Sequence, residues 1–356
     1  MYDKQGLVSI QALRAIAAIA VAFAHITNSE LPRQLGIPNP LPGAEVGSAG
    51  VDLFFVISGF VMVYASERFF RRPAGPHEFL LRRIARIVPL YWVMTSIILA
   101  YLLWHYGSLE AVNFSPQVVI ASYMFVPYPQ TNGYMAPVHG VGWSLNFEMF
   151  FYLCFCLALP LGRRPGVVAV VALLACLVAF NRTWGLPPPL DYLALPIVLE
   201  FAMGMLVALA VREGYRLPLF VCIALVVAGA AGYVLSYWHP DIDHMVVWGI
   251  PSALLVAGVT LAGPSLTPSP LSRGIAFMGD ASYAFYLVHP IAITLPRRLL
   301  GAILTPGAAP VLYAVFVLIV AGIAACAVHV LFERPLTRYL QDVIAFMFSQ
   351  KRLARV

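Results

Sequence analysis

Long runs of apolar residues, separated by shorter polar stretches, recur along the whole chain. Each run has about 17–20 residues, the length that an α-helix needs to cross the hydrocarbon core of a bilayer. The apolar residues are continuous rather than alternating, which is typical of helices and not of a transmembrane barrel. The pattern predicts ten spans, at residues 8–27, 50–66, 87–105, 141–160, 167–181, 192–210, 218–236, 244–262, 281–297 and 311–331.

The composition agrees with an all-α polytopic membrane protein. Hydrophobic residues make up 61% of the 356 residues and charged residues only 11%, a balance that soluble domains do not have. In such a protein the net charge of +6 reports topology rather than affinity for nucleic acid, and we expect no nucleic-acid partner. The 5 cysteines lie in apolar runs without metal-ligand spacing, so we expect packing roles for them and no bound metal.

The distribution of Lys and Arg predicts that both termini lie in the cytoplasm. With ten spans and cytoplasmic termini, the outer loops hold few of the 22 Lys and Arg residues, namely Arg33, Arg182, Arg297 and Arg298. This bias follows the positive-inside rule. We therefore expect a multi-pass protein of the inner (cytoplasmic) membrane. Its transmembrane domain would occupy residues 1–335, and a basic amphipathic tail at 336–356 would lie on the inner leaflet.

Two polar side chains interrupt the first predicted span. A guanidinium in hydrocarbon costs at least about 2.5–3.5 kcal/mol, so Arg14 needs a buried polar reason to be there. His25 follows eleven residues later. That spacing places the two side chains within about 20° on one helix face and about 16 Å apart along the axis. The topology puts Arg14 nearer the cytoplasm and His25 nearer the outer face.

Two acidic residues are predicted at the depth of His25. Asp52 opens the second span and Glu148 lies in the first two turns of the fourth, and both spans start at the outer face. An imidazole with nearby carboxylates is typical of general base catalysis, because the carboxylate orients the ring and stabilises its protonated form. We therefore predict catalytic roles for His25, Asp52 and Glu148. Asp52 also suits a simpler role at the positive end of a helix dipole.

A basic cluster precedes the third predicted span. Arg83 and Arg86 are one helical turn apart and share a face. Clustered guanidinium groups bind phosphates in a bidentate manner. Anchoring to lipid headgroups is the simpler alternative for the same charges. In the functional interpretation, a phosphate-rich cofactor enters from the cytoplasm at this cluster and meets Arg14 deeper in the membrane.

Other polar and aromatic residues have less specific interpretations. Glu200 and His289 lie at mid-depth in the sixth and ninth spans, where pore-lining or helix-pairing roles are expected. His244 has no spacing that argues for a metal. The outer loop at 106–140 is rich in tyrosine, which suits either an interfacial aromatic belt or stacking on sugar rings.

Several of these motifs together resemble the acyltransferase-3 family of integral membrane acyltransferases. The matching stretches are Arg14 with His25, GVDLFFVISG from 50, RRIARIVPLYW from 82, WSLNFE from 143 and SYAFYLVHP from 282. They follow the family order over almost the whole chain. WSLNFEMFFY looks like the ExoZ-like branch of exopolysaccharide and O-antigen O-acetyltransferases. Many relatives have Ser-Val-Glu-Glu-Gln here, and this chain keeps the first acid as Glu148 but lacks the second acid and the Gln.

The resemblance implies transfer of an acyl group, usually acetyl, from cytoplasmic acyl-coenzyme A to a carbohydrate hydroxyl. The implied partners are acetyl-CoA, a carbohydrate or lipid-linked glycan, the lipid bilayer and separate polysaccharide-assembly proteins. The donor-binding residues would be Arg14, Arg83, Arg86, Tyr91 and Trp92. The acceptor-binding residues would be Trp143, Ser144, Asn146 and His289.

Two mechanisms and two other classes of protein stay open. His25 could take the proton from the acceptor hydroxyl as it attacks the thioester, or could briefly carry the acyl group. An extended pantetheine arm could cover the distance of about 16 Å from Arg14 to His25. A transporter or lipid-linked glycan flippase would instead use the intramembrane charges as a proton or solute path. A non-catalytic scaffold of a polysaccharide export complex would leave those charges unexplained.

Overall fold

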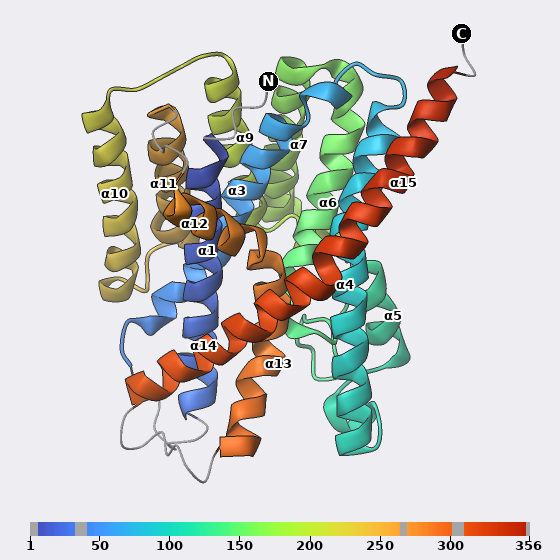
Figure 1. Ribbon diagram of the computed structural model, residues 1–356, viewed down its shortest axis with the longest axis vertical. Coiled ribbons are helices and arrows are strands. Elements are labelled where there is room, and N and C mark those ends of the chain that lie inside the picture. Colours follow the sequence, from blue (N-terminus) through green and yellow to red (C-terminus); the bar gives the residue numbers. More distant parts are fainter. Residues whose placement is uncertain (1–5, 33–40, 264–268, 301–309, 354–356) are drawn as a thin grey trace. The chain divides into compact units, whose positions relative to one another are not determined.

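The computed structural model describes residues 6–32, 41–263, 269–300 and 310–353. All regular secondary structure in these ranges is helical, without β-strands (Figure 1). In these ranges, 7 helices are long and apolar enough to cross a membrane: Val8–Ser29, Ala44–Ala65, Gly75–Tyr106, Gly140–Leu161, Arg163–Trp184, Leu219–Trp238 and Pro310–Ser349. Two shorter apolar helices, Met245–Leu261 and Ser282–Ile293, coincide with predicted spans. The all-helical membrane fold is confirmed. The count of ten spans and the cytoplasmic termini stay predictions.

The helices form two compact units. The first comprises residues 1–61 and 200–327. Its described helices are α1 (Gly6–His25), the larger part of α3 (Gly50–Ala65), α9 (Leu199–Arg212), α10 (Leu219–Trp238), α11 (Ile250–Leu261), α12 (Pro270–Asp280), α13 (Ser282–Leu300) and α14 (Pro310–Val328). The long helix α10 lies beside α11 (Figure 1).

Glycine brings two helices of the first unit into backbone contact. A Cβ on Gly59 of α3 would lie 2.0 Å from the carbonyl oxygen of Phe201 on α9. A Cβ on Gly204 of α9 would lie 1.9 Å from the carbonyl oxygen of Val56 on α3. Small residues permit such close approach between membrane helices. The contact fixes how α3 and α9 are aligned.

The second unit comprises residues 62–199 and 328–356. Its described helices are α4 (Gly75–Tyr106), α5 (Pro116–Met124), α6 (Trp143–Ala158), α7 (Arg163–Trp184), α8 (Leu190–Leu193) and α15 (Arg334–Leu353). The helix α4 has 32 residues and begins well before the predicted span at 87–105. Arg83 and Arg86 therefore lie within a continuous helix rather than in a segment that precedes it.

The described part of the C-terminal tail is helical and forms hydrogen bonds with α4. Within α15, Gln341 accepts a hydrogen bond from Nη1 of Arg82 (2.6 Å) and donates one to the carbonyl oxygen of Arg82 (2.8 Å). The expected contact of the tail with the membrane surface stays a prediction. Arg33 of the predicted outer loops and residues 354–356 of the tail lie outside the described residues.

Three π-helical turns begin at or directly after a histidine. The turn η1 (Ile26–Glu30) follows His25, η8 (Met245–Gly249) follows His244, and η9 (His329–Glu333) starts at His329. Such turns are rare and occur frequently at functional sites. Two of these histidines, His25 and His244, belong to the first unit, and His329 belongs to the second.

Candidate functional site

His25 and His289 form a hydrogen-bonded pair in the first unit. Nδ1 of His25, at the end of α1, lies 2.7 Å from Nε2 of His289 on α13, and the two ring planes differ by 12°. Nδ1 of His289 lies 3.1 Å from the carbonyl oxygen of Phe285, one turn earlier in α13. His289 is fully buried and His25 is partly buried. The pair is therefore linked to a backbone acceptor.

This chain of hydrogen bonds assigns the tautomer of each neutral ring. A carbonyl oxygen only accepts, so Nδ1 of His289 carries the hydrogen and its Nε2 is an acceptor. His25 must then donate through Nδ1. The lone pair of His25 is left on Nε2, as a general base requires.

An apolar cluster holds the histidine pair in place. Ile26 directly follows His25, and Ile293 lies one turn beyond His289. Both belong to a buried cluster that also includes Tyr313, Ala314 and Val317 of α14. Packing of this kind fixes the side-chain rotamers of a polar pair beside it.

Arg14 and His25 share one uninterrupted helix, as the sequence predicted. The helix α1 runs from Gly6 to His25 without a break. Nη1 of Arg14 lies 3.4 Å from Oε1 of Gln11, and Nε2 of Gln11 donates to Oδ1 of Asp280 at 2.6 Å. The guanidinium is thus joined through Gln11 to an acid at the end of α12. Its contact with a cofactor stays a prediction.

Asp52 has other partners than the predicted one. Its Oδ1 lies 3.3 Å from Nε2 of His244, and its carboxylate is beside that of Glu200 on α9. The imidazole of His25 is instead oriented by His289. Both ring nitrogens of His289 are engaged in hydrogen bonds, and its contact with a substrate stays a prediction. The prediction that Asp52 orients His25 failed because the partners of both residues come from segments far apart in sequence.

In the second unit, Glu148 lies beside the basic cluster of α4. The hydroxyl of Tyr152 donates to the Glu148 carboxylate one turn earlier in α6. The Arg83 guanidinium lies 5.7 Å from the centre of the Tyr152 ring and interacts electrostatically with Glu148 and Arg86. The predicted separation of Glu148 and Arg83 to opposite sides of the membrane is therefore wrong. The reason is that α4 carries Arg83 into the packed part of the unit, where α6 meets it.

The basic cluster has a net positive charge. Two guanidinium groups, on Arg83 and Arg86, face the one carboxylate of Glu148. Arg82 is used differently, because it pairs with Glu78 at 3.0 Å and bonds to Gln341. An excess of guanidinium groups at one place favours a bound anion such as phosphate.

Tyr91 and Trp92, which are predicted to bind the donor, make contacts within the second unit. Tyr91 is fully buried, and its ring centre lies 4.7 Å from that of Phe125. A Cβ on Gly142 would lie 2.7 Å from the Tyr91 hydroxyl, so the loop before α6 covers the ring. The indole N–H of Trp92 donates to the carbonyl oxygen of Tyr123 at 2.9 Å. Their contact with the donor stays a prediction.

The three residues of α6 that are predicted to bind the acceptor differ in their contacts. Ser144 is buried and donates to the carbonyl oxygen of Val141 at 3.2 Å. Trp143 packs edge to face on Phe147, with ring centres 6.0 Å apart. Asn146 is buried, and its Oδ1 has no hydrogen-bond partner among the described residues. The contact of these three residues with an acceptor stays a prediction.

A pocket of about 510 Å³ opens between two loops of the second unit. Tyr128 lines it from the long loop before α6, and Pro188, Pro189, Asp191 and Tyr192 line it around α8. The Tyr192 hydroxyl is a hydrogen-bond donor that a bound ligand could use. Aromatic and apolar walls with a few polar groups are typical of ligand pockets of this size. The sequence indicated the tyrosine-rich loop but missed the second wall.

Comparison with known proteins identifies the class. The acyltransferase domain model of the acyltransferase-3 family matches residues 7–330. The chain is 35% identical over 300 residues to the exopolysaccharide production protein ExoZ of Rhizobium meliloti, covering 82% of this chain and 90% of that protein. It is 30% identical over 376 residues to the acyltransferase MdmB of Streptomyces mycarofaciens, covering 94% and 92%. A match of 28% identity to the peptidoglycan O-acetyltransferase OatA of Listeria monocytogenes covers 43% of this chain and 24% of that protein. No solved structure matches.

The helical membrane fold and these matches together define a membrane acyltransferase. The chain belongs to the acyltransferase-3 family.

Proposed function

We propose that this protein is an O-acyltransferase of the cytoplasmic membrane that uses acyl-CoA to acylate a surface polysaccharide or glycolipid. The acyl group is expected to be acetyl. Two relatives support the acceptor class by their names, which refer to exopolysaccharide production and to O-acetylation of peptidoglycan. The observation that carries the chemistry is the histidine pair, in which His289 leaves Nε2 of His25 as the basic nitrogen.

In the proposed reaction, Nε2 of His25 removes the proton from the acceptor hydroxyl as its oxygen attacks the thioester carbonyl. The carbon–sulfur bond breaks, and the thiolate of coenzyme A takes the proton from His25. The products are the ester and free coenzyme A. While His25 is protonated, its Nδ1–H bond to His289 becomes charge-assisted and therefore stronger. His289 acts as a positioning residue that sets the tautomer and stabilises the imidazolium.

We assign the donor phosphates to Arg83 and Arg86 because of the net positive charge of their cluster. The double variant R83A/R86A is expected to bind acetyl-CoA at least about tenfold more weakly, since charged hydrogen bonds contribute roughly 1.5–3 kcal/mol each. Isothermal titration calorimetry in detergent measures this affinity. The control is R163A, which removes a guanidinium of the same unit that is paired with Glu67 at 2.8 Å. Equal affinity in the double variant and R163A would return the cluster to a topological role.

We assign part of the acceptor glycan to the pocket between Tyr128 and Tyr192. Removing a stacking ring should cost about 0.5–1.5 kcal/mol, so Y128A is expected to raise the KM for the glycan roughly two- to tenfold with kcat nearly unchanged. Steady-state kinetics at saturating acetyl-CoA separate the two constants. The matched control is Y106A, which removes an exposed tyrosine outside the pocket. An unchanged KM in Y128A would leave the tyrosine-rich loop as an interfacial belt.

The rival function is a transporter or lipid-linked glycan flippase that uses the intramembrane charges as a path. The two functions differ in one reaction. Purified acyltransferase releases coenzyme A from acetyl-CoA when a glycan acceptor is supplied, whereas a flippase leaves the thioester intact. A thiol-reactive dye that detects free coenzyme A distinguishes them.

A further inference from the structure

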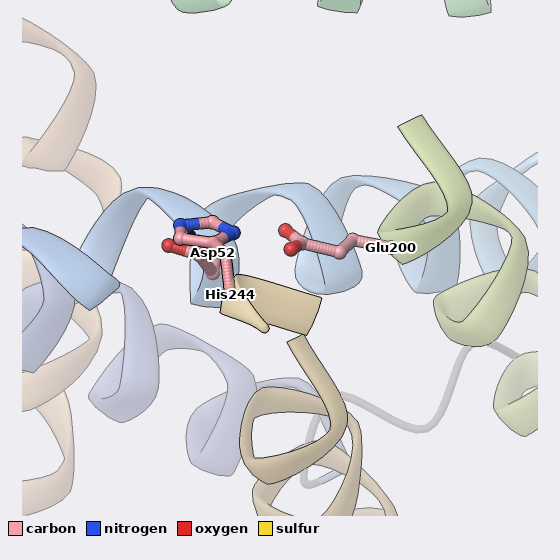
Figure 2. Close-up of side chains that lie close together, drawn as sticks. All are labelled: Asp52, Glu200 and His244. Atoms are coloured by element: carbon pink, nitrogen blue, oxygen red, sulfur yellow. Dashed lines mark ion pairs between the residues drawn. The ribbon is translucent and has the colours of Figure 1, made fainter. Parts of the chain in front are cut away.

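A second polar cluster in the first unit has no role in the proposed acyl transfer. It consists of Asp52 from the first turn of α3, Glu200 from the first turn of α9, and His244, which directly precedes η8. Figure 2 shows the three side chains approaching one another from these separate segments. One ligand atom of each residue lies within 4.8 Å of the other two. The three residues are distant in sequence, so the tertiary fold and not a local turn brings them together.

The two acids are almost completely buried, and their only close basic neighbour among the described residues is the His244 imidazole. Asp52 is 1% exposed and Glu200 is 0% exposed. Among the described residues, none donates a hydrogen bond to Oδ1 of Asp52 or to either carboxylate oxygen of Glu200. Adjacent carboxylates in such a place repel each other and have lost their hydration. A protonated His244, a proton shared between the two acids or a bound cation can compensate them.

We propose that Asp52, Glu200 and His244 bind a divalent cation of the Zn²⁺ type. An imidazole together with carboxylates suits zinc, whereas calcium and magnesium favour all-oxygen sites. Zinc bonds of about 2.0–2.2 Å place tetrahedral ligands roughly 3.3–3.6 Å apart. The distance of 3.3 Å between Nε2 of His244 and Oδ1 of Asp52 matches that spacing. Protein ligands then number three, and zinc takes its fourth from water.

The surroundings are consistent with a preformed site that a cation can enter. The His244 side chain is 46% exposed, while the acids lie behind it. The Trp248 ring meets the imidazole edge to face, with ring centres 4.8 Å apart, and so restricts its orientation. A Cβ on Gly249 would lie 3.0 Å from Oε1 of Glu200, so glycine leaves room for the carboxylate. A bound cation would connect α3, α9 and η8 and hold these three segments together.

The test uses the full-length protein purified in detergent, stripped with EDTA and re-equilibrated with ZnCl₂. Mass spectrometry of the metal should find about one zinc per chain, and zinc should raise the thermal unfolding midpoint. The variants E200Q and H244A are expected to lose both the bound zinc and the thermal shift. The control D241N removes an exposed acid near His244 in sequence but outside the cluster, and it should retain both.

H244A keeps the test decisive if E200Q does not fold, because His244 is half-exposed and its removal leaves the buried acids in place. Equal zinc content in the wild type and H244A, without a thermal shift, would overturn the proposal and leave a proton shared between Asp52 and Glu200. Loss of zinc in D241N would also contradict it. Neither readout measures acyl transfer, so the inference stands or falls independently of the proposed function.

Discussion

Replacing His25 with alanine should abolish acyl transfer while leaving acyl-CoA binding nearly unchanged. General base catalysis contributes about 10²–10⁴-fold to a rate, so kcat is expected to fall by at least that factor. Binding should persist because His25 is not part of the Arg83 and Arg86 cluster assigned to the donor phosphates. Transfer of radiolabelled acetyl to a glycan measures turnover, and calorimetry measures binding.

The control for this variant is H239A, which removes an exposed histidine of the same unit outside the histidine pair. It should retain wild-type turnover. Turnover in H25A comparable with that of H239A would remove His25 from the mechanism. Loss of donor binding together with turnover would instead indicate a misfolded variant.

Replacing His289 with leucine should lower kcat roughly 10²-fold or more, with little change in KM. Leucine cannot accept the Nδ1–H of His25, so the ring loses the partner that sets its tautomer and stabilises its protonated form. A wrong tautomer in a hydrolase triad costs a factor of about 10⁴, which sets the scale. The measurement is the kinetics of H289L under saturating donor and acceptor.

The conservative variant H289Q separates this positioning role from packing. A glutamine carbonyl oxygen can accept the hydrogen bond from His25, so H289Q should recover a large part of the kcat that H289L loses. Equal and severe losses in both variants would mean that the volume of the buried ring matters rather than its hydrogen bond. Full activity in H289L would end the assignment.

Hydropathy predicted where the membrane helices lie along the chain, but it did not predict where all of them begin and end. The predicted span at 8–27 corresponds closely to α1 (Gly6–His25), because a long apolar run in lipid has to be helical. The predicted third span starts at residue 87, whereas the helix that contains it starts at Gly75. The arginine-rich stretch before it is also helical from Gly75, and hydropathy reports only the apolar part of a helix.

The sequence revealed the unusual polar residues better than their partners. Arg14 and His25 were recognisable because polar side chains inside an apolar run are costly and therefore rare. The partners of His25 and Asp52 depend on how α1 packs on α13 and how α3 packs on α9. One signal for them was present, since His289 and Glu200 were also intramembrane polar residues that needed partners. A single sequence does not indicate that His289 pairs with His25 or that Glu200 pairs with Asp52.

In the proposed reaction this protein acylates a surface glycan with His25 as the base. The most direct test is mass spectrometry of surface glycans from three strains. In all three the native gene is deleted; one then expresses the wild-type protein, one expresses H25A, and one expresses neither. Glycans from wild-type cells should carry the added mass of an acyl group, and those from H25A cells should resemble glycans of cells without the protein. The same acyl mass in all three samples, or glycans that differ in amount but not in acylation, would contradict the account.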